Sequence, residues 1–442
     1  MNTIYQPLKM AMLLSLLLLG GSCKLDTVSP NAPNEVDVLT TRSGIIGLSV
    51  GLRQFNSTSG ISAAYFYPAV TSRELQGLAT FTNVLELEAG GTQLPTANGS
   101  VLTLWSNMQR LMDMSQDIID NAPKVSTING DLLPHIVANA KLFKAIALGT
   151  LAISFEQANI ATSKTEKVKF VPRAQVLAEA IRLLDEAIAA VNATPVSADF
   201  NSLVAGTGFD LKSILYAFSA RYNLMAGNYA AALASANAVD LTKANAYQYN
   251  AQSVNPIWNN LANLKYYSPR LRFGLPANLF EAGDKRFDFY VTTTSATNGT
   301  TGEVTLSYAL KGFGTSQTSV VPVYLPDEIK LIKAEAILRS GGALATARDL
   351  IDEVRTQVSG DVFGVNAGLP AYSGPLTQAD LLAEVYRQRS AELYLSGQRL
   401  EDSRRFGRPF SATDFSERNR NFYPYPDQER LNNPNTPADP AI

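Results

Sequence analysis

Residues 211–239, LKSILYAFSARYNLMAGNYAAALASANAV, decide how the rest of the sequence is interpreted. We expect a helix over residues 211–226 that ends at Gly227, because glycine readily adopts the left-handed backbone that closes many helices. A second helix begins directly afterwards, at Tyr229. Its small alanine side chains let two neighbouring helices approach closely. The stretch therefore predicts a tightly packed helical hairpin.

The same kind of hairpin recurs along the chain, and its turn is similar to that of a tetratricopeptide repeat. The helix expected at 136–155 is rich in alanine and apolar on more than one side, which is typical of a helix packed between neighbours. The expected fold class is therefore mainly α, with about four tetratricopeptide-like helix pairs. These pairs are expected around residues 136–191, 211–239, 327–358 and 378–406.

Two long segments interrupt the helix pairs, at residues 56–100 and 240–325. Both are expected to be irregular and rich in loops, with aromatic side chains distributed along them. Within 285–325, Asn298-Gly299 and Gly302 interrupt runs rich in Thr, Val and Tyr, which predicts a small β-hairpin. A helix is expected between the two segments, at 102–121, where the spacing of the apolar residues places Trp105 in the core.

The first residues have the layout of an export signal. Lys9 is followed by ten residues without a charge, MAMLLSLLLL, and then by small residues up to Cys23, the only cysteine among 442 residues. This apolar run is too short to span a bilayer. It resembles a bacterial lipoprotein leader, so residues 1–22 are expected to be removed and Cys23 to be acylated. An ordinary cleaved signal with an incidental cysteine is the alternative.

The polar residues after Cys23 are expected to form a lipid-attached linker over 23–36, and residues 37–442 a single domain. No second apolar run approaches the length of a membrane span, so the expected attachment is through lipid alone. The formal net charge is −2, and it becomes −3 once Lys9 is removed. Without a basic field, nucleic acid is not an expected partner.

The residues that catalysis and metal binding commonly need are scarce. The chain has one histidine, His135, and one cysteine, which excludes a multi-histidine zinc site. His135 is expected at the surface or in a capping role. Carboxylates are plentiful, but no local sequence places two of them in a recognisable arrangement. We expect no enzymatic activity, no catalytic residues, no cofactor and no metal site, while a calcium ion in a loop is left open.

Two C-terminal motifs carry a family resemblance. Residues 385–407 read VYRQRSAELYLSGQRLEDSRRFG, and residues 421–435 read NFYPYPDQERLNNPN. With residues 331–355, they resemble the SusD/RagB family of outer-membrane nutrient-binding lipoproteins. The residues that match the pattern of this family are Arg389, Glu392, Leu393, Tyr394, Gly397, Arg399, Pro424, Pro426 and Glu429.

The resemblance implies a fold, a location and a partner. The four helix pairs would form a right-handed scaffold that carries an irregular, ligand-facing part. The protein would lie in the outer membrane and face the cell surface, where it would cover a TonB-dependent transporter of the SusC type as a lid. Ligand would be held between lid and transporter.

The charged residues of the motif indicate a structural role. Arg389 lies three residues before Glu392, so we expect an ion pair across one helical turn. Arg404, Arg405 and Arg408 are expected to form a solvated basic cluster at the end of the last helix, where cations suit the negative end of the helix dipole.

Candidate ligand-binding residues lie on the irregular segments. Sugars present flat C–H faces that stack on aromatic rings, while amide and charged side chains bind their hydroxyl groups. The expected function is capture of an oligosaccharide and its delivery to the transporter. Two alternatives remain, an oligopeptide-binding lid of the RagB type and a helical repeat that scaffolds another protein. The predicted ligand-binding residues are Tyr65, Phe66, Tyr67, Arg73, Glu74, Phe81, Asn83, Trp258, Tyr266 and Tyr267.

Overall fold

The computed structural model describes residues 35–163, 165–297, 304–410 and 417–442. The expected leader, Cys23 and most of the linker lie outside these residues. Most of the described chain is α-helical, and its strands form two-stranded antiparallel sheets. The predicted mainly α class with small β insertions is therefore confirmed.

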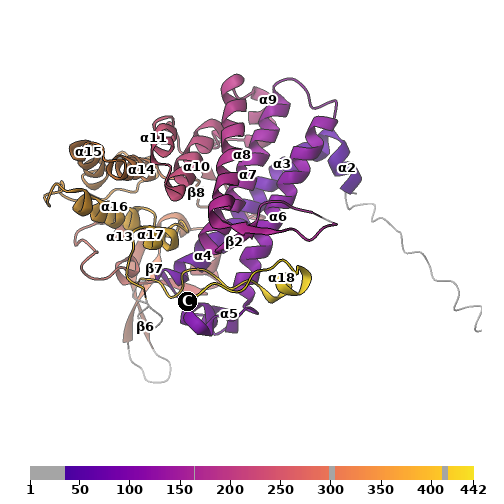
Figure 1. Cartoon of the computed structure of the whole chain (residues 1–442). Helices are drawn as coiled ribbons and strands as arrows, with labels where there is room; N and C mark the ends of the chain where they lie inside the picture. The colour runs from indigo at the N-terminus through magenta and orange to yellow at the C-terminus, as the bar shows by residue number, and fades with distance from the viewer. Residues whose placement is uncertain (1–34, 164, 298–303, 411–416) are drawn as a thin grey trace, which may run out of the picture.

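The helix α7 (Leu132–Ser154) lies at the centre of the helical part, between α6 (Gly99–Asn121) and α8 (Arg173–Ala193). It is long and apolar enough to cross a membrane, but 83% of its most apolar window is buried inside the protein. Its apolar surface is covered by the neighbouring helices on several sides. The expectation of a helix packed between neighbours is confirmed (Figure 1).

The hairpin that decided the sequence interpretation is formed by α10 (Leu211–Ala226) and α11 (Tyr229–Asn237). Gly227 has φ +81° and ψ +9°, in the left-handed region. The two N–H groups after α10 donate to carbonyl groups of its last turn at 3.1 and 2.8 Å. This geometry closes the helix as predicted, because only glycine adopts such backbone without a steric cost.

The remaining helix pairs extend the row away from α7 (Figure 1). Helix α10 packs on α8, α11 packs on α14, and α14 packs on both α15 and α16. The last expected pair differs from the others, because the short α17 packs on α4. At the turn before α17, a Cβ on Gly397 would lie 2.3 Å from the carbonyl oxygen of Ala64 on α4, so glycine permits this approach. The bounds are α14 Pro326–Arg339, α15 Leu344–Arg355, α16 Gln378–Glu392, α17 Arg399–Arg405 and α4 Ile61–Thr71.

The expectation of loops over residues 56–100 is wrong. After α3 (Arg42–Phe55) the chain continues through a π-helical turn, Asn56–Gly60, into α4, and α5 (Thr82–Ala89) follows. Helix α4 reads ISAAYFYPAVT and is buried on several sides. A helix that is apolar nearly all round has no helical periodicity in its sequence, so the pattern could not reveal it.

The strands form four separate pairs. The predicted hairpin is present as β6 (Val291–Thr297) and β7 (Val304–Leu310), with Val291 opposite Leu310. Its turn lies outside the described residues. The pair β1 (Leu75–Gly77) and β5 (Tyr267–Pro269) joins the two segments expected to bind ligand. The other pairs are β2 Gln157–Asn159 with β3 Phe170–Pro172, and β4 Ala246–Tyr247 with β8 Val321–Pro322.

The C-terminal residues, including α18 (Asp427–Asn432), lie across the side of the helical part (Figure 1). Tyr423 and Tyr425 are fully buried. Trp105 on α6 packs edge to face on Tyr425, with 6.3 Å between the ring centroids, so its predicted core position is confirmed. The short helices are α2 Glu35–Thr40, α9 Ala198–Phe200, α12 Pro256–Trp258 and α13 Lys285–Tyr290.

Candidate ligand-binding surface

The structure brings together two of the predicted aromatic residues, Phe81 and Tyr266. Their rings meet edge to face at 83°, with 5.4 Å between the centroids. The Phe81 ring is 54% exposed, and Tyr266 is half-buried. An exposed ring held by a second ring offers a ligand a flat apolar face at little entropic cost. This pair is the best candidate for a stacking site among the predicted residues.

The β1–β5 strand pair places the two rings next to each other. Beyond the last strand pair, the backbone N–H groups of Leu78 and Ala79 both donate to the carbonyl oxygen of Tyr266, at 2.8 and 3.2 Å. Phe81 then stands immediately before α5, where its carbonyl accepts the N–H of Leu85 at 3.0 Å. The backbone of Tyr266 is therefore held by the segment after β1, and the backbone of Phe81 by the first turn of α5.

Three leucines near the ring pair are also exposed, to between 43% and 53% of their surface. Leu78 follows β1, Leu85 lies one turn along α5 from Phe81, and Leu264 lies shortly before Tyr266. We call the five residues Leu78, Phe81, Leu85, Leu264 and Tyr266 the Phe81 surface. The exposed side chains of Thr80, Thr82 and Lys265 add hydrogen-bonding groups beside it. Apolar residues exposed together often mark a binding surface.

Unusual backbone is concentrated around the same strand pair. In the part of the chain that the structure describes, the non-glycine residues with positive φ, between 53° and 66°, are Arg73, Lys265, Arg272, Phe273 and Leu395. Four of them flank β1 or β5, and Leu395 donates its N–H to Glu74, beside β1, at 3.0 Å. Such conformations cost free energy and cluster at functional sites. Their position supports the β1–β5 region as the ligand-binding part.

The predicted residue Arg73 is used within the protein. It donates to the carbonyl oxygen of Glu88 at 3.2 Å and lies 3.6 Å from the carboxylate of the same residue. Arg270 also pairs with Glu88, whose carboxylate in addition accepts the N–H of Gly77 at 3.0 Å. Two arginines thus share one carboxylate at the edge of β1.

Three predicted ligand-binding residues are buried instead. Phe66 and Tyr267 stack on each other in the core, with 5.8 Å between the ring centroids. Glu74 is 1% exposed and accepts the N–H of Leu395, so it fixes a turn of the backbone. Burial raises the pKa of the Glu74 carboxyl, although Arg399 and the hydrogen bonds oppose this shift. These three side chains cannot reach a ligand, so they are withdrawn as candidates.

The other predicted residues lie apart from the ring pair or are already occupied. The amide of Asn83 donates to the hydroxyl of Ser100 at 2.9 Å. Tyr67 on α4 and Trp258 on α12 are half-buried. Tyr65 lines a small pocket. The structure therefore supports only part of the predicted set.

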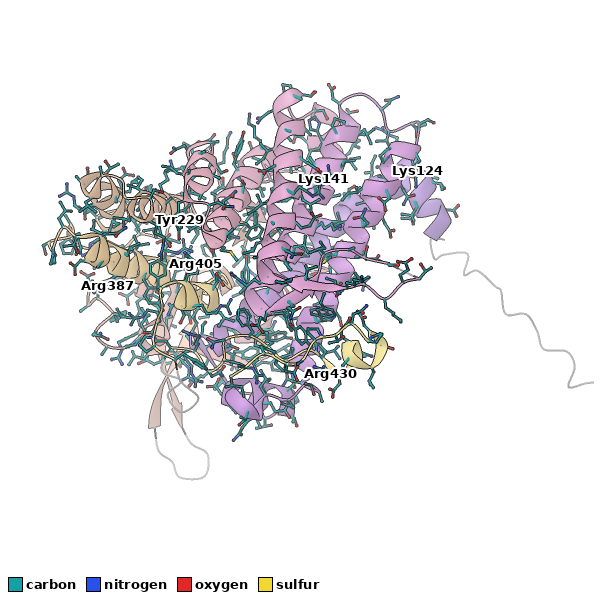
Figure 2. All side chains as sticks on the ribbon, in the orientation of Figure 1. Lys124, Lys141, Tyr229, Arg387, Arg405 and Arg430 are labelled. Atoms are coloured by element: carbon teal, nitrogen blue, oxygen red, sulfur yellow. The ribbon has the colours of Figure 1, made fainter. Side chains whose placement is uncertain are left out.

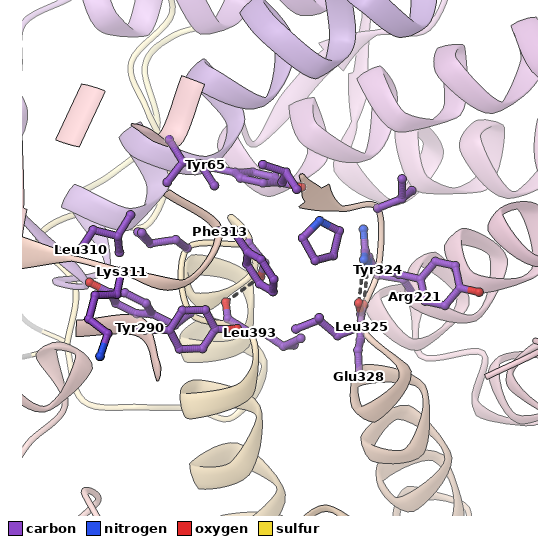
Figure 3. A pocket seen from close by; sticks show the side chains of 17 residues that line it. Tyr65, Arg221, Tyr290, Leu310, Lys311, Phe313, Tyr324, Leu325, Glu328 and Leu393 are labelled. Atoms are coloured by element: carbon purple, nitrogen blue, oxygen red, sulfur yellow. Dashed lines mark hydrogen bonds and ion pairs between the residues drawn. The ribbon is translucent and has the colours of Figure 1, made fainter. Parts of the chain in front are cut away.

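The small pocket beside Tyr65 lies between the helices and the β6–β7 insertion (Figure 3). Its walls are mainly apolar and aromatic, and Arg221 and Glu328 form a bidentate ion pair on one side, at 2.6 and 2.7 Å. Burial raises the pKa of Tyr65 to about 12. The cavity volume is about 40 Å³, which holds a few water molecules. It is too small for a sugar residue.

The expected ion pair between Arg389 and Glu392 is wrong. Arg389 instead binds Asp402 on α17, with 2.8 Å from Nε to Oδ2 and 3.2 Å from Nη2 to Oδ1. Glu392 pairs with the fully buried Arg286 at 3.2 Å. Buried charges need partners in fixed geometry, and such partners were available from other segments of the chain. The structural role expected for the motif holds, but the partners differ.

The expected solvated basic cluster is also wrong. Arg405, which is labelled in Figure 2, is mostly buried and pairs with Glu335 on α14 and with Asp402, the latter at 2.7 Å. Arg404 pairs with Glu401 at 2.6 Å, and Arg408 pairs with Glu417 at 2.6 Å. Burial alone would raise the pKa of Glu335, but the charge of Arg405 outweighs it and the pKa lies below its ordinary value. Arg405 thus binds α17 to α14, Arg404 pairs within α17, and Arg408 binds Glu417 beyond the end of that helix.

His135 is fully buried on α7, although a surface or capping position was expected. Its Nε2 lies 3.1 Å from the carbonyl oxygen of Thr194, and its Nδ1 accepts the N–H of Ser197 at 3.4 Å. The ring thereby holds the segment after α8. Among the residues that the structure describes, no three or more His, Cys, Asp or Glu side chains are grouped in a way that could hold a metal ion.

Sequence reasoning missed Leu78, Leu85, Leu264 and Lys265 as members of this surface. Single leucines in segments that are expected to be loops carry no distinctive pattern, because isolated exposed apolar residues are common on any protein. The pairing of β1 with β5 brings the two segments together at this surface, and neither segment alone predicts it. The one usable indication was that both segments carried candidate aromatic residues.

Comparisons with known proteins address the fold. Residues 327–439 match the family model described as the SusD family. Similar solved structures are a SusD superfamily protein from Bacteroides thetaiotaomicron VPI-5482 (14% identity, 90% of this chain, 100% of that chain, TM-score 0.70), a SusD-like carbohydrate binding protein from Bacteroides vulgatus ATCC 8482 (15%, 82%, 83%, 0.64) and B. fragilis NanU (11%, 93%, 99%, 0.66). At these identities the likeness establishes a shared fold. No curated protein matches this chain.

Proposed function

Because this chain belongs to the SusD/RagB family, we propose that it is a surface-exposed nutrient-binding lipoprotein. In this proposal it captures an oligosaccharide and delivers it to a TonB-dependent outer-membrane transporter of the SusC type. One similar structure is that of a SusD-like carbohydrate binding protein, which supports sugar as the ligand class. The protein holds its ligand and changes no covalent bond in it.

The observation that carries the proposal is the exposed ring pair on the β1–β5 strand pair. Phe81 and Tyr266 meet at 5.4 Å and present an apolar face. Exposed hydroxyl groups of Thr80 and Thr82 and the ammonium group of Lys265 lie close in sequence to the rings. A sugar that stacks on the rings would use such groups to bind its hydroxyls.

A binding screen of glycans and peptides against the purified chain tests the proposal. We expect a glycan to bind saturably and Phe81→Ala to weaken that binding. Leu431→Ala is the matched control, since Leu431 on α18 is a large apolar residue that is 85% exposed and lies outside the Phe81 surface. If the two variants lost affinity equally, or if the chain converted a glycan into product, the proposal would be wrong.

Oligopeptide binding is a second candidate, because three of the five residues of the Phe81 surface are leucines. Aliphatic side chains offer no ring to stack on a sugar, but they pack well against apolar side chains of a peptide. In the same screen, saturable binding of peptides with no bound glycan would assign the site to peptides. The variant Leu78→Ser would then weaken binding more than Phe81→Tyr, which keeps the ring.

The membrane attachment proposed here depends on Cys23. Acyl chains on this residue contribute about 0.8 kcal/mol per buried methylene, so several chains hold a protein firmly. We expect wild-type protein in the outer-membrane fraction and Cys23→Ser protein in the soluble fraction. Mass spectrometry of the mature N-terminus would identify the acyl groups. An unmodified Cys23 in membrane-derived protein would contradict this part of the proposal.

The proposed partner is a transporter of the SusC type. Affinity purification of the chain from outer membranes in mild detergent is expected to recover a TonB-dependent β-barrel protein in a fixed ratio. Recovery of the chain alone under conditions that preserve other outer-membrane complexes would count against the delivery step, while leaving ligand capture to be judged by the binding screen.

A further inference from the structure

A polar pocket lies on another part of the molecule, where α3 meets the segments before and after β4. Its volume is about 200 Å³. It shares no residue with the Phe81 surface. We call it the Arg53 pocket, and the residues that matter for the argument are Arg53, Gln54, Ser57, Thr207, Gln248 and Asn250.

Arg53 on α3 has no carboxylate partner within 4 Å in the described part of the chain. Its Nη1 donates to the carbonyl oxygen of Ala205, and its guanidinium carbon lies 5.4 Å from the centroid of the Phe209 ring. Burial lowers the pKa of Arg53. A half-buried cation normally pairs with an anion, since its desolvation is otherwise uncompensated.

Other buried arginines in the same protein show the contrast. Arg286 binds both Asp284 and Glu392, and Arg405 binds both Glu335 and Asp402. Each of these side chains has two carboxylates, whereas Arg53 has none. Arg418 and Arg420 also have no carboxylate within 4 Å in the described residues, but several backbone carbonyl and side-chain oxygens surround their guanidinium groups. Arg53 differs from them because its guanidinium lines a polar pocket.

The rest of the lining is polar but uncharged. Amide side chains come from Gln54, Gln248 and Asn250, and hydroxyl groups from Ser57 and Thr207, with no aspartate or glutamate among the lining residues. Such groups bind hydroxyls and carbonyls without competing for the guanidinium. Together they surround one cation with neutral hydrogen-bonding groups.

The residue whose backbone lies next to the guanidinium is a glycine, Gly206, so no side chain covers the cation there. Gly206 has φ +64°, and a Cβ built there would lie 3.8 Å from Nη2 of Arg53. A larger residue at this position would be strained and would pack against the guanidinium. Glycine here keeps the backbone close to Arg53 without covering it.

We propose that the Arg53 pocket binds the carboxylate of a small hydroxylated acid, of the size of a single uronic acid. The planar fork of a guanidinium matches a carboxylate with two parallel hydrogen bonds. The surrounding amide and hydroxyl groups match the hydroxyl groups of such a ligand. The volume is below the roughly 300–1,000 Å³ of pockets for larger ligands, which favours one small residue. This site is independent of the one proposed for nutrient capture.

Calorimetric titration of the full chain in mild detergent, at pH 7 and low salt, tests the proposal. The probes are glucuronate and galacturonate, with glucose and galactose as neutral counterparts and sulfate as an inorganic anion. We expect saturable binding of at least one uronate, at least tenfold tighter than its neutral counterpart. Absence of uronate binding, equal binding of the neutral sugar, or sulfate binding as tight as the uronate would overturn the assignment.

Two variants locate the binding. Arg53→Gln removes the cation, and we expect at least a tenfold loss of uronate affinity, because the charge-assisted hydrogen bonds to the carboxylate are lost. Gln54→Glu places a carboxylate beside Arg53, at a position that is exposed to solvent. We expect this variant to lose a similar amount of uronate affinity, because the new carboxylate occupies the guanidinium. Its melting temperature should be unchanged or higher. This second variant decides the matter if Arg53→Gln fails to fold.

Arg110→Gln is the matched control. Arg110 is also an arginine over an aromatic ring, 4.9 Å from the centroid of Phe55, but it is exposed and does not line the pocket. We expect its uronate affinity to equal that of the wild type. Unchanged affinity in both Arg53→Gln and Gln54→Glu, or an equal loss in Arg110→Gln, would show that the uronate binds elsewhere.

Discussion

Arg405 on α17 and Glu335 on α14 form an ion pair inside the protein, with 2.5 Å between Nη1 and Oε1, and Glu335 is fully buried. The same arginine binds Asp402 at 2.7 Å, and Asp402 binds Arg389. A continuous series of ion pairs therefore joins α14, α16 and α17. Because these charges are buried, each depends on its partner for stability.

The ion pairs predict how stability depends on pH. Burial would raise the pKa of Glu335, Glu401 and Asp402, but the neighbouring arginines outweigh it and hold all three below their ordinary values. A carboxyl whose folded-state pKa is lowered contributes stability above its unfolded-state pKa, about 4, and loses it as the pH falls through the folded value. We expect the chain to unfold cooperatively below about pH 4, as followed by far-UV circular dichroism.

Arg405→Gln tests the origin of this acid sensitivity. The variant leaves Glu335 and Asp402 with less positive charge, so we expect a loss of about 3–5 kcal/mol in the free energy of unfolding at pH 7. We also expect acid unfolding to begin at a higher pH. Arg348→Gln is the control, since Arg348 pairs with the exposed Asp349 and the variant should leave the free energy of unfolding nearly unchanged. Equal acid midpoints in the two variants would refute the explanation.

The ring pair predicts a loss of ligand affinity. Phe81→Ala removes an exposed ring and the edge-to-face contact that holds Tyr266. We expect affinity for the bound nutrient to fall by about 2- to 12-fold, which corresponds to about 0.5–1.5 kcal/mol of stacking. Tyr266→Ala should cause a similar loss, and the double variant should lose less than the sum because the two rings act together. Fully additive losses measured by calorimetry would mean that the rings bind the ligand independently.

A glycine on α7 makes room for a tyrosine on α10. A Cβ on Gly149 would lie 2.1 Å from Cζ of Tyr222, whose ring is buried. We therefore expect Gly149→Ala to destabilise the protein by about 1–3 kcal/mol in urea unfolding, despite the higher helix propensity of alanine. Gly47→Ala on the exposed side of α3, where a Cβ meets no atom within 4 Å, should instead stabilise it by about 0.5–1 kcal/mol. If both variants changed the free energy of unfolding in the same direction, the proposed close packing of Gly149 against Tyr222 would be contradicted.

The C-terminal segment predicts a fluorescence change. Tyr425 packs on Trp105, Phe155 and Phe170, and its hydroxyl accepts the N–H of Gln157 at 3.0 Å. In a Trp258→Phe background only Trp105 emits, because the chain has two tryptophans. We expect Tyr425→Ala to shift this emission to longer wavelength and to cost about 3–5 kcal/mol.

Tyr425→Phe is the companion variant in the same background. It keeps the ring packing and removes only the hydroxyl group, so the emission should keep its wavelength and the cost should be about 1–3 kcal/mol. If Tyr425→Ala left the emission unchanged, Trp105 would not depend on the C-terminal segment for its burial.

Much of the scaffold could be predicted from local pattern. The α10–α11 hairpin followed from Gly227 and the residues beside it, and the β6–β7 hairpin from the runs rich in Thr and Val. Helix α4 could not be predicted, because it is apolar on several faces and has no periodicity. Local pattern identifies an element when one side of it is exposed to water and the other is buried.

The sequence predicted only part of the candidate site. The sequence selected Phe81 and Tyr266 for their residue type, but it also selected Phe66 and Tyr267, which are in the core. Aromatic residues serve both packing and binding, so residue type alone does not separate the two uses. Exposure separates them, and exposure depends on which other segments cover the ring.

The sequence by itself determined the helical class, the main hairpins and the family resemblance, because these depend on residues that are near each other along the chain. Only the tertiary structure decided that Arg389 binds Asp402, that Glu392 binds Arg286, and that the β1–β5 pair joins Phe81 to Tyr266. These contacts connect segments that are distant in sequence. Their partners are selected by burial and by the geometry of packed helices, and neither is encoded in any single stretch.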